Sequence, residues 1–264
     1  MNQRLQAELA PRAIGTETVD LSLRLLEFLA HSTAAVGLSE LARQFQASKA
    51  TLHRHLQTLA HHGFVHQEAG TMRYAAGIKL FVLGERLRER FDVLAVARPE
   101  MARLRDETEH AVTLSALVED QVVVLELIQG TSFVNIGTQP GTVLPLHASA
   151  HGKVALAFGP ADLLSRCLSR PLKTWTPHTV NTRSALERAV AQVRSRGWAS
   201  TPNQVLQGVN GLAAPVFSHS GAYAGAVAVA GTVQTVPGSP SAELVKAVQR
   251  AAAQISRALG YSAK

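Results

Sequence analysis

The sequence predicts an α+β protein of two domains that helices connect, and three observations carry this prediction. Residues 18–77 show a helical apolar pattern that ends in a short hairpin, and two further helical runs follow it. From Ala111 onward the apolar pattern becomes that of strands joined by tight turns, with helices between them. Such a mixture favours an antiparallel sheet over a parallel, doubly wound one. At 264 residues the chain has room for two domains of ordinary size.

The first domain is organised around the stretch from Gly37 to Tyr74. A helix over roughly residues 19–30 precedes this stretch and has leucines on its core side. Within the stretch, apolar side chains at helical spacing predict a short helix, a tight turn and a second helix. We expect Ser39 to cap the first of these helices and Ser48 to cap the second, because a serine hydroxyl accepts a hydrogen bond from a free amide of the first turn.

A hairpin is predicted to follow the second of these helices. Three leucines spaced i, i+4 and i+7 give that helix a buried face, and Gly63 follows its end, as glycine commonly does. A strand that begins at Phe64 and a returning strand at residues 72–74 then complete the pattern of a winged helix-turn-helix.

The exposed face of that second helix suits the major groove of DNA. Lys49 and Arg54 can reach guanine edges or phosphates, and Ala50 lets the helix approach the groove floor or a thymine methyl group. Between residues 43 and 73, four basic side chains stand against one acidic side chain, a local net charge of +3. A solvated basic face on a helical hairpin is the alternative interpretation. The predicted DNA-contacting set is Ser39, Ser48, Lys49, Ala50, Thr51, His53, Arg54 and, on the wing, Arg73.

The composition indicates a soluble globular protein with an anionic partner. Hydrophobic residues make up 46% and charged residues 17% of the chain, and the net charge is +7. No run of 18 apolar residues and no apolar leader occur, so we expect no membrane partner and a cytoplasmic location. Cys167 is the single cysteine, which excludes an internal disulfide framework and a cysteine-rich metal site. We expect no metal and no cofactor.

Two helical runs connect the predicted domains. The first covers residues 77–91 with three leucines in register, and the second covers residues 93–110 with Pro99 inside it. A proline at that place starts a new helix or kinks an existing one. Connectors of this kind often pair in dimers, and the alternative is that they complete the core of the first domain. The expected organisation is a lead-in at 1–17, a DNA-binding domain at 18–77, a linker helix at 78–92 and a second domain at 93–264.

The second domain is expected to hold two hairpins and several helices. Two strand runs flank the turn at residues 119–121, and two more, at residues 212–217 and 223–230, flank a second turn. Another extended run covers residues 133–148. Helices are expected over residues 149–158, 161–168, 183–196 and 241–259.

No arrangement of residues predicts an enzyme. His147 and His151 have the i, i+4 spacing of zinc ligands on a helix, but no acidic residue accompanies them. The string HASAHGKV lacks both the first glycine and the final Ser or Thr of a phosphate-binding loop. Ser149 and Ser220 lie outside any GxSxG turn, and Cys167 lies in an ordinary helix where it is expected to pack.

The chain resembles the IclR family of bacterial transcription regulators over about residues 19–260. The matching pieces are LSELARQF and ASKATLHRHLQTL in the first domain, LPLHASAHGKVALAF in the middle, and GLAAPVF followed by AVAVAG near the end. The resemblance implies an N-terminal winged helix-turn-helix, a helical linker that dimerises, and a C-terminal effector domain of GAF-like α/β fold. It also implies binding to operator DNA as a dimer or tetramer, under the control of a small metabolite that is often a carboxylic acid.

The resemblance further implies where the effector is held. Free amides at a helix N-terminus bind a carboxylate without help from a lysine, and Lys153 either adds charge or points to solvent. Carried onto this chain, the effector-binding set comprises Leu146, Ala148, Ser149, Ala150, His151 and Gly152, then Asn203, Gln204 and Gly211, and finally Ala228 and Ala230.

This chain departs from the family pattern at that pocket. Many members have a cysteine where it has Gly211, serines where it has Ala228 and Ala230, and acidic residues where it has Asn203 and Gln204. The replacements leave a roomier and more apolar pocket, which suits an aromatic carboxylic acid better than glyoxylate or pyruvate. The alternative is a vestigial pocket in a domain that only assembles oligomers.

Two functions from different classes are therefore in view. The first is a DNA-binding transcriptional regulator that senses a small carboxylic acid and controls catabolic genes. The second is a ligand-binding or assembly protein whose helix-turn-helix mediates protein contacts. Lys49 and Arg54 distinguish the two, because only the first function needs them to read DNA.

Overall fold

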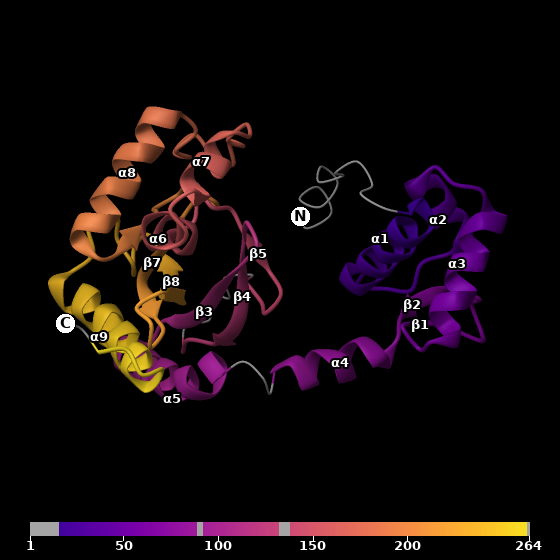
Figure 1. Ribbon diagram of the computed structural model, residues 1–264, viewed down its shortest axis with the longest axis horizontal. Helices are drawn as coiled ribbons and strands as arrows, with labels where there is room; N and C mark the ends of the chain where they lie inside the picture. The colour runs from indigo at the N-terminus through magenta and orange to yellow at the C-terminus, as the bar shows by residue number, and fades with distance from the viewer. Residues whose placement is uncertain (1–15, 89–91, 132–137, 263–264) are drawn as a thin grey trace. The chain divides into compact units, whose positions relative to one another are not determined.

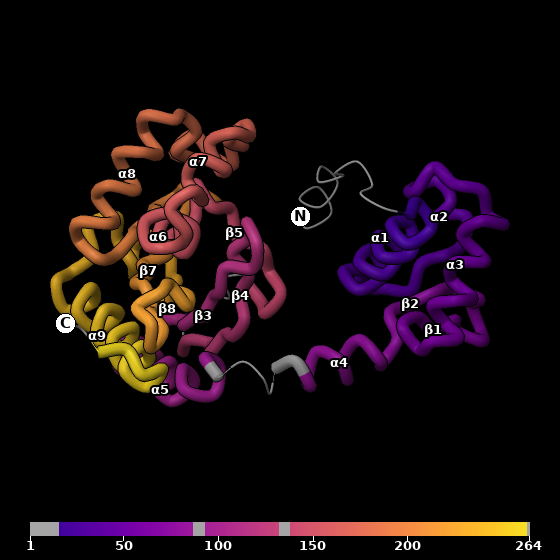
Figure 2. The backbone as a smooth tube through the Cα atoms, in the orientation of Figure 1, coloured from indigo at the N-terminus to yellow at the C-terminus, as the bar shows by residue number. Residues whose placement is uncertain are grey.

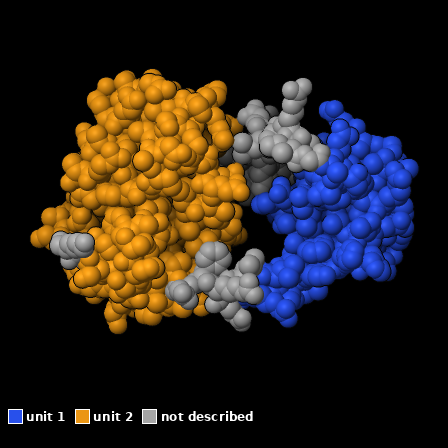
Figure 3. All heavy atoms as spheres, viewed as in Figure 1, with its two compact units in different colours: residues 1–90 blue, residues 91–264 orange. Residues whose placement is uncertain are grey.

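The computed structural model describes residues 16–88, 92–131 and 138–262 (Figure 1). It divides into two compact units, residues 1–90 and residues 91–264 (Figure 3). Most of the predicted lead-in and the start of the extended run predicted at 133–148 lie outside the described residues. In the described part of the chain, no helix is long and apolar enough to cross a membrane.

The first unit is a three-helix domain with a hairpin. Its core comes from leucines that recur at helical spacing and from two side chains of the hairpin, Val65 and Tyr74. Val36 extends the hairpin by pairing with Tyr74 in an antiparallel bridge. The elements are α1 (Glu17–His31), α2 (Leu38–Phe45), α3 (Lys49–His61), β1 (Val65–Gln67), β2 (Tyr74–Ala76) and α4 (Ile78–Arg88).

Two local predictions in this unit are wrong. Ser39 does not cap α2, because the helix already begins at Leu38 with Gly37 as its N-cap residue and with no side-chain cap. The returning strand begins at Tyr74 rather than at residue 72, because Met72 has a φ of 56° and so still belongs to the turn. Two other predictions are confirmed: Ser48 caps α3, and Gly63, with a φ of 75°, follows its end. Strand β1 begins at Val65, one residue after the predicted start at Phe64.

Helix α4 is not a core helix of this unit. Ile78 is 74% exposed, Phe81 64% and Leu83 40%, so the leucine register read from the sequence does not correspond to a buried face. The side chain of Leu87 lies outside the described residues. An open groove of about 650 Å³ runs beside the start of the helix, lined by Ala30, His66, Ala76, Gly77, Ile78, Leu80 and Phe81.

In its described residues, the second unit is built on one six-stranded antiparallel sheet, in which β3 lies beside β8. The strand order is β5-β4-β3-β8-β7-β6, and every neighbouring pair is antiparallel, which confirms the α+β class. The strands are β3 (Ala111–Val118), β4 (Gln121–Ile128), β5 (Val143–Leu144), β6 (Ala199–Ser200), β7 (Val209–Phe217) and β8 (Tyr223–Thr232). Figure 2 traces the backbone through them.

Helices cover both faces of this sheet (Figure 1). On one face lie α5 (Asp92–Thr108), a single helix that continues through Pro99, and α9 (Ala242–Ala258), which Ser241 caps. On the other face lie α6 (Ala150–Phe158), α7 (Leu163–Leu168) and α8 (Arg183–Arg196).

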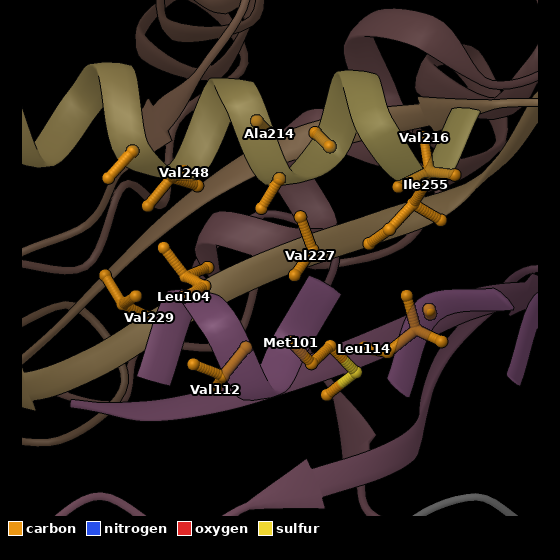
Figure 4. Close-up of a cluster of buried hydrophobic side chains, with 14 of the residues drawn as sticks. Met101, Leu104, Val112, Leu114, Ala214, Val216, Val227, Val229, Val248 and Ile255 are labelled. Carbon is orange, nitrogen blue, oxygen red and sulfur yellow. The ribbon is translucent and has the colours of Figure 1, made fainter. Parts of the chain in front are cut away.

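Strand alternation explains why the two faces differ in chemistry. Val112 and Leu114 of β3 join α5 and α9 in an apolar core, where Val227 of β8 and Ile255 of α9 also lie (Figure 4). Thr113, which lies between Val112 and Leu114 on β3, faces α6 instead. The sheet therefore offers a closed apolar face to α5 and α9 and a partly polar face to α6.

Candidate functional site

Helix α3 has a fixed N-terminus. Ser48 Oγ accepts a hydrogen bond from the amide of Thr51 at 3.1 Å and lies 2.9 Å from the Thr51 hydroxyl. Leu52 and Leu56 are fully buried, which anchors the opposite side of the helix to the core. The helix is therefore held by its cap and by its apolar face.

The exposed face of α3 is basic at its start. Lys49, Ala50 and Arg54 are exposed. Ion pairs within the described part of this unit engage Arg24 and Arg73, but neither Lys49 nor Arg54. The structure thus brings Ser48, Lys49, Ala50, Thr51 and Arg54 together at one end of one helix, as the sequence predicts.

Three other predicted DNA-contacting residues are placed differently. Arg73 Nε donates to the carbonyl oxygen of Ala35 at 2.7 Å, and its Nη2 donates to Glu40 at 3.2 Å, so the guanidinium ties the hairpin to α2. His53 Nδ1 lies 3.2 Å from the hydroxyl of the buried Tyr74. Ser39 is exposed in the first turn of α2. Arg73 and His53 therefore have structural partners already.

A second candidate site lies at the N-terminus of α6, the most buried helix of the chain's described part. Ser149 caps the helix: its hydroxyl accepts from the amide of Gly152 at 2.9 Å and donates to the carbonyl oxygen of Pro145 at 2.8 Å. The amides of Ala150 and His151 have no hydrogen-bond partner among the described residues. Two buried N–H groups at the positive end of a helix dipole form a ready site for an anion.

The strands beneath this helix carry small side chains near its start. Gly211 of β7 is paired with Ala230 of β8, and Ala228 is paired with Thr113 of β3. A Cβ atom at Gly211 would lie 3.5 Å from the Cβ atom of Ala150, at ordinary contact distance. The structure therefore brings the helix start and the small residues of β7 and β8 together, and the loop residue Leu146 packs near the same apolar cluster.

His151 contributes its amide to this site but not its ring. Thr113 Oγ1 lies 2.8 Å from Nε2 and Ser115 Oγ lies 2.7 Å from Nδ1, so both ring nitrogens are engaged by β3. Burial lowers the pKa of the imidazole to about 4, so the ring is neutral at physiological pH. The two hydroxyl residues interrupt the apolar run of β3, a signal that the sequence analysis overlooked.

The two predicted residues of the loop before β7 have different roles. Asn203 adopts a φ of 60°, and its Oδ1 accepts from the amide of Gly208 at 2.7 Å, so its side chain closes the loop rather than lining the site. Gln204 instead points to α6, where its Oε1 accepts from Lys153 Nζ at 2.6 Å. The hydroxyls of Thr176 and Thr179 hold this loop by donating to the backbone oxygens of Asn203 and Gln204.

Lys153 is buried, with an exposed fraction of 3%, so its side chain does not point to solvent. Burial lowers the pKa of its ammonium to about 8, and the nearby Arg196 guanidinium adds to the shift. The sequence leaves the role of this side chain open, because no short-range pattern shows which loop covers it.

The structure does not bring together the residues that could have formed a zinc site or a catalytic group. His147 Nε2 lies 2.8 Å from the carbonyl oxygen of Lys173, so the two histidines do not converge on a common point. No group of three His, Cys, Asp or Glu residues in the described ranges could hold a metal ion. Cys167 is half-buried in α7, and burial raises the pKa of its thiol.

Comparison with known proteins covers both units. Residues 18–69 match the "IclR helix-turn-helix domain", and residues 86–257 match "Bacterial transcriptional regulator IclR C-terminal". The glycerol operon regulatory protein of Streptomyces griseus is 33% identical over 246 residues, which cover 92% of this chain and 96% of that protein. The HTH-type transcriptional regulator XynR of Escherichia coli K12 is 30% identical over 248 residues, which cover 94% of this chain and 98% of that protein.

Solved structures share the same fold. An IclR homologue from Microbacterium hydrocarbonoxydans, crystallised in complex with 4-hydroxybenzoate, superposes with a TM-score of 0.78. It is 25% identical in sequence, and the match covers 92% of this chain and 98% of that chain. The likeness therefore includes the helix-turn-helix unit and the unit that contains α6.

Proposed function

Because the chain belongs to the IclR family of bacterial transcriptional regulators, we propose that α3 reads operator DNA and that a small carboxylic acid bound beside α6 controls this binding. The family consists of regulators rather than enzymes, which agrees with the expectation from the sequence. A regulator of bacterial promoters works beside the chromosome, so the proposal places the protein in the cytoplasm.

The exposed basic start of α3 is the observation that carries the DNA-binding part. A recognition helix needs a buried side that fixes it and exposed donors near its N-terminus. Leu52 and Leu56 supply the first, and Lys49 and Arg54, without ion-pair partners among the described residues, supply the second. Arg73 is not part of the proposed set, because its guanidinium already binds Ala35 and Glu40.

Replacing Arg54 by alanine is expected to weaken operator binding by about 1–3 kcal/mol and to relax base preference at one position of each half-site. The operator is first selected from random duplexes, and affinities are then measured by fluorescence anisotropy at fixed salt. Arg188→Ala removes the same charge from an exposed position on α8 and serves as the control. Equal affinity of the two variants would favour a helix-turn-helix that contacts proteins instead.

The proposed active form is a homodimer, or a tetramer of two such dimers. One recognition helix reads too few base pairs to select a site in a genome, and two-fold dimers solve this by binding two half-sites. Helix α4 supports the proposal, because Ile78, Phe81 and Val82 recur at i, i+3 and i+4 and are all exposed. A partner helix of a second copy would cover this apolar stripe.

The proposed effector is an aromatic carboxylic acid, which would link the protein to catabolic genes. The free amides of Ala150 and His151 suit a carboxylate, and Gly211, Ala228 and Ala230 leave apolar room for a ring. The Microbacterium hydrocarbonoxydans homologue that was crystallised with 4-hydroxybenzoate supports the class of ligand without naming the one for this chain.

Titration calorimetry against a panel of acids tests this class. Benzoate and its ring-substituted relatives are expected to bind, whereas glyoxylate and pyruvate are expected to give no heat, since they leave the apolar part of the site empty. An acid at about 100 times its dissociation constant should also stabilise the protein by about 2.7 kcal/mol in a thermal-shift assay. Gly211→Val fills the space beside Ala150 and should weaken the binding of the aromatic acids. Selective binding of two- and three-carbon acids would refute the proposal.

A further inference from the structure

Lys153 carries a buried positive charge that no carboxylate balances within the described ranges. Its residue is 3% exposed, and its Nζ donates to a single described acceptor, the neutral amide oxygen of Gln204, at 2.6 Å. A buried ammonium is costly unless an anion pairs with it, and an ammonium has three hydrogens to donate. The buried ammonium of Lys153 is therefore electrostatically unfavourable, and a negatively charged ligand beside it would stabilise it.

The surroundings of Lys153 are positive or neutral rather than acidic. Burial lowers the pKa of Lys153, and the positive charge of Arg196 at the end of α8 adds to this shift. Burial also lowers the pKa of His147, with a smaller contribution from the positive charge of Lys153. Among the described residues, the other titratable or charged side chains that contact α6 or belong to its first turn are His151, Cys167 of α7, Arg194 of α8 and Tyr223 of β8. None of these groups carries a negative charge at neutral pH.

We propose that Lys153 is the counter-charge of the effector carboxylate, and that the effector replaces Gln204 as the partner of its ammonium. This inference rests on the proposed effector site, because it places the same ligand at the same helix. Lys153 belongs to the first turn of α6, in which the amides of Ala150 and His151 are free. In the proposed arrangement, the ammonium and these two amides bind one anion together.

The exchange of partners gives the ligand a mechanical effect. Gln204 belongs to the loop before β7, and Lys153 Nζ is the group that joins this loop to α6. When an acid takes the ammonium, the Gln204 side chain loses its donor, while the hydroxyls of Thr176 and Thr179 still hold the backbone of the loop. Binding of the ligand thus changes the contact between α6 and the loop.

The pH dependence of binding follows from the same geometry. Only the protonated ammonium attracts the carboxylate, and in the free protein its pKa is about 8. Affinity is therefore full below this pKa and falls as the pH rises through it, by about tenfold between pH 7 and pH 9. The bound anion raises the pKa of Lys153, so binding at pH 8.5 takes up protons from the buffer.

The test uses benzoate, a monoanion throughout this pH range, and the full-length protein. Calorimetry at pH 7 and pH 9, in two buffers of different ionisation enthalpy, measures both the affinity and the proton uptake. Lys153→Met removes the charge but keeps an unbranched side chain that is one atom shorter. It should weaken binding at pH 7 at least tenfold, and the pH dependence and the proton uptake should be lost. Lys246→Met removes an exposed lysine of α9 and should bind as the wild type does.

Gln204→Glu supplies a second, independent test. Its carboxylate would pair with Lys153 and act as an internal competitor, so thermal stability should rise while benzoate affinity falls at least tenfold. Benzoate binding that is independent of pH and unchanged in Lys153→Met would overturn the inference and leave the effector site standing. If the wild type binds no acid of the panel, the proposed effector function fails, and a higher melting temperature of Gln204→Glu would then identify Lys153 as an unpaired charge of another role.

Discussion

Replacing Gly152 by alanine is expected to displace the start of α6 and to abolish binding of the acid. A Cβ atom at this residue would lie 2.6 Å from the carbonyl oxygen of Pro145 and still closer to the backbone of Leu146. These obstacles are backbone atoms, which cannot rotate away, so the helix or the loop has to move. Overpacking of this kind costs about 1–3 kcal/mol of stability and sometimes more.

The loss of binding should exceed the loss of stability. The amides of Ala150 and His151 lie in the turn that has to shift, and a hydrogen bond to a charged group contributes about 1.5–3 kcal/mol. Losing two such bonds would lower the affinity for the effector acid by about a hundredfold or more. Calorimetry gives the affinity, and thermal unfolding gives the stability.

Gly84→Ala is the matched control for this change. A Cβ atom at Gly84 would meet nothing within 4 Å, and the residue lies inside α4. Alanine should therefore stabilise that helix by about 0.5–1 kcal/mol and leave the affinity for the acid unchanged. Wild-type affinity in Gly152→Ala would show that the turn at the start of α6 does not hold the ligand.

Replacing Phe81 by aspartate is expected to dissociate the dimer and to cost most of the affinity for the operator. Phe81 is 64% exposed on α4, between Ile78 and Val82 on the same apolar stripe. If a second copy covers this stripe, the substitution buries an unpaired charge, which costs several kcal/mol. A monomer contacts one half-site only, so operator affinity should fall by at least about a hundredfold.

Sedimentation velocity and anisotropy on the same samples separate the two effects. The variant should sediment as a monomer at concentrations at which the wild type is a dimer, and it should keep its helical content because Phe81 is not part of the core. Val118→Asp places the same charge on an exposed apolar residue of the other unit and should change neither property. A wild type that is monomeric, or a Phe81→Asp variant that remains dimeric, would contradict the role proposed for α4.

The elements that local pattern predicts best are those whose signals lie within one or two helical turns. Helix α8 matches its predicted bounds of 183–196, and Ser48 and Ser241 cap α3 and α9 through their own hydroxyls. The cap predicted at Ser39 fails for a related reason. Several residues near a helix start can satisfy the pattern. The extended residue that precedes α2 is Gly37, at a φ of −76°, so the helix begins two residues earlier than a cap at Ser39 would place it.

The candidate effector site was predicted as a set of positions, but not with the roles that those positions have. His151 and Asn203 were included for their places in the pattern, yet the ring of His151 bonds to β3 and the side chain of Asn203 closes its own loop. Lys153 was left undecided and is buried. Each of these outcomes depends on a partner far away in the chain or on a local backbone conformation that the side-chain pattern does not encode.

Apolar spacing, caps and turn residues act over short stretches, so the sequence alone predicts the class of the fold, the order of most elements and the helix-turn-helix. The motifs that the chain shares with the IclR family likewise indicate its family. Which polar groups are engaged and which remain free depends on contacts between distant segments. Gln204 meets Lys153 across 51 positions of the chain, and Arg73 meets Ala35 across 38. Such contacts arise only when distant segments pack, so the charge left unbalanced at Lys153 became visible only in the folded chain.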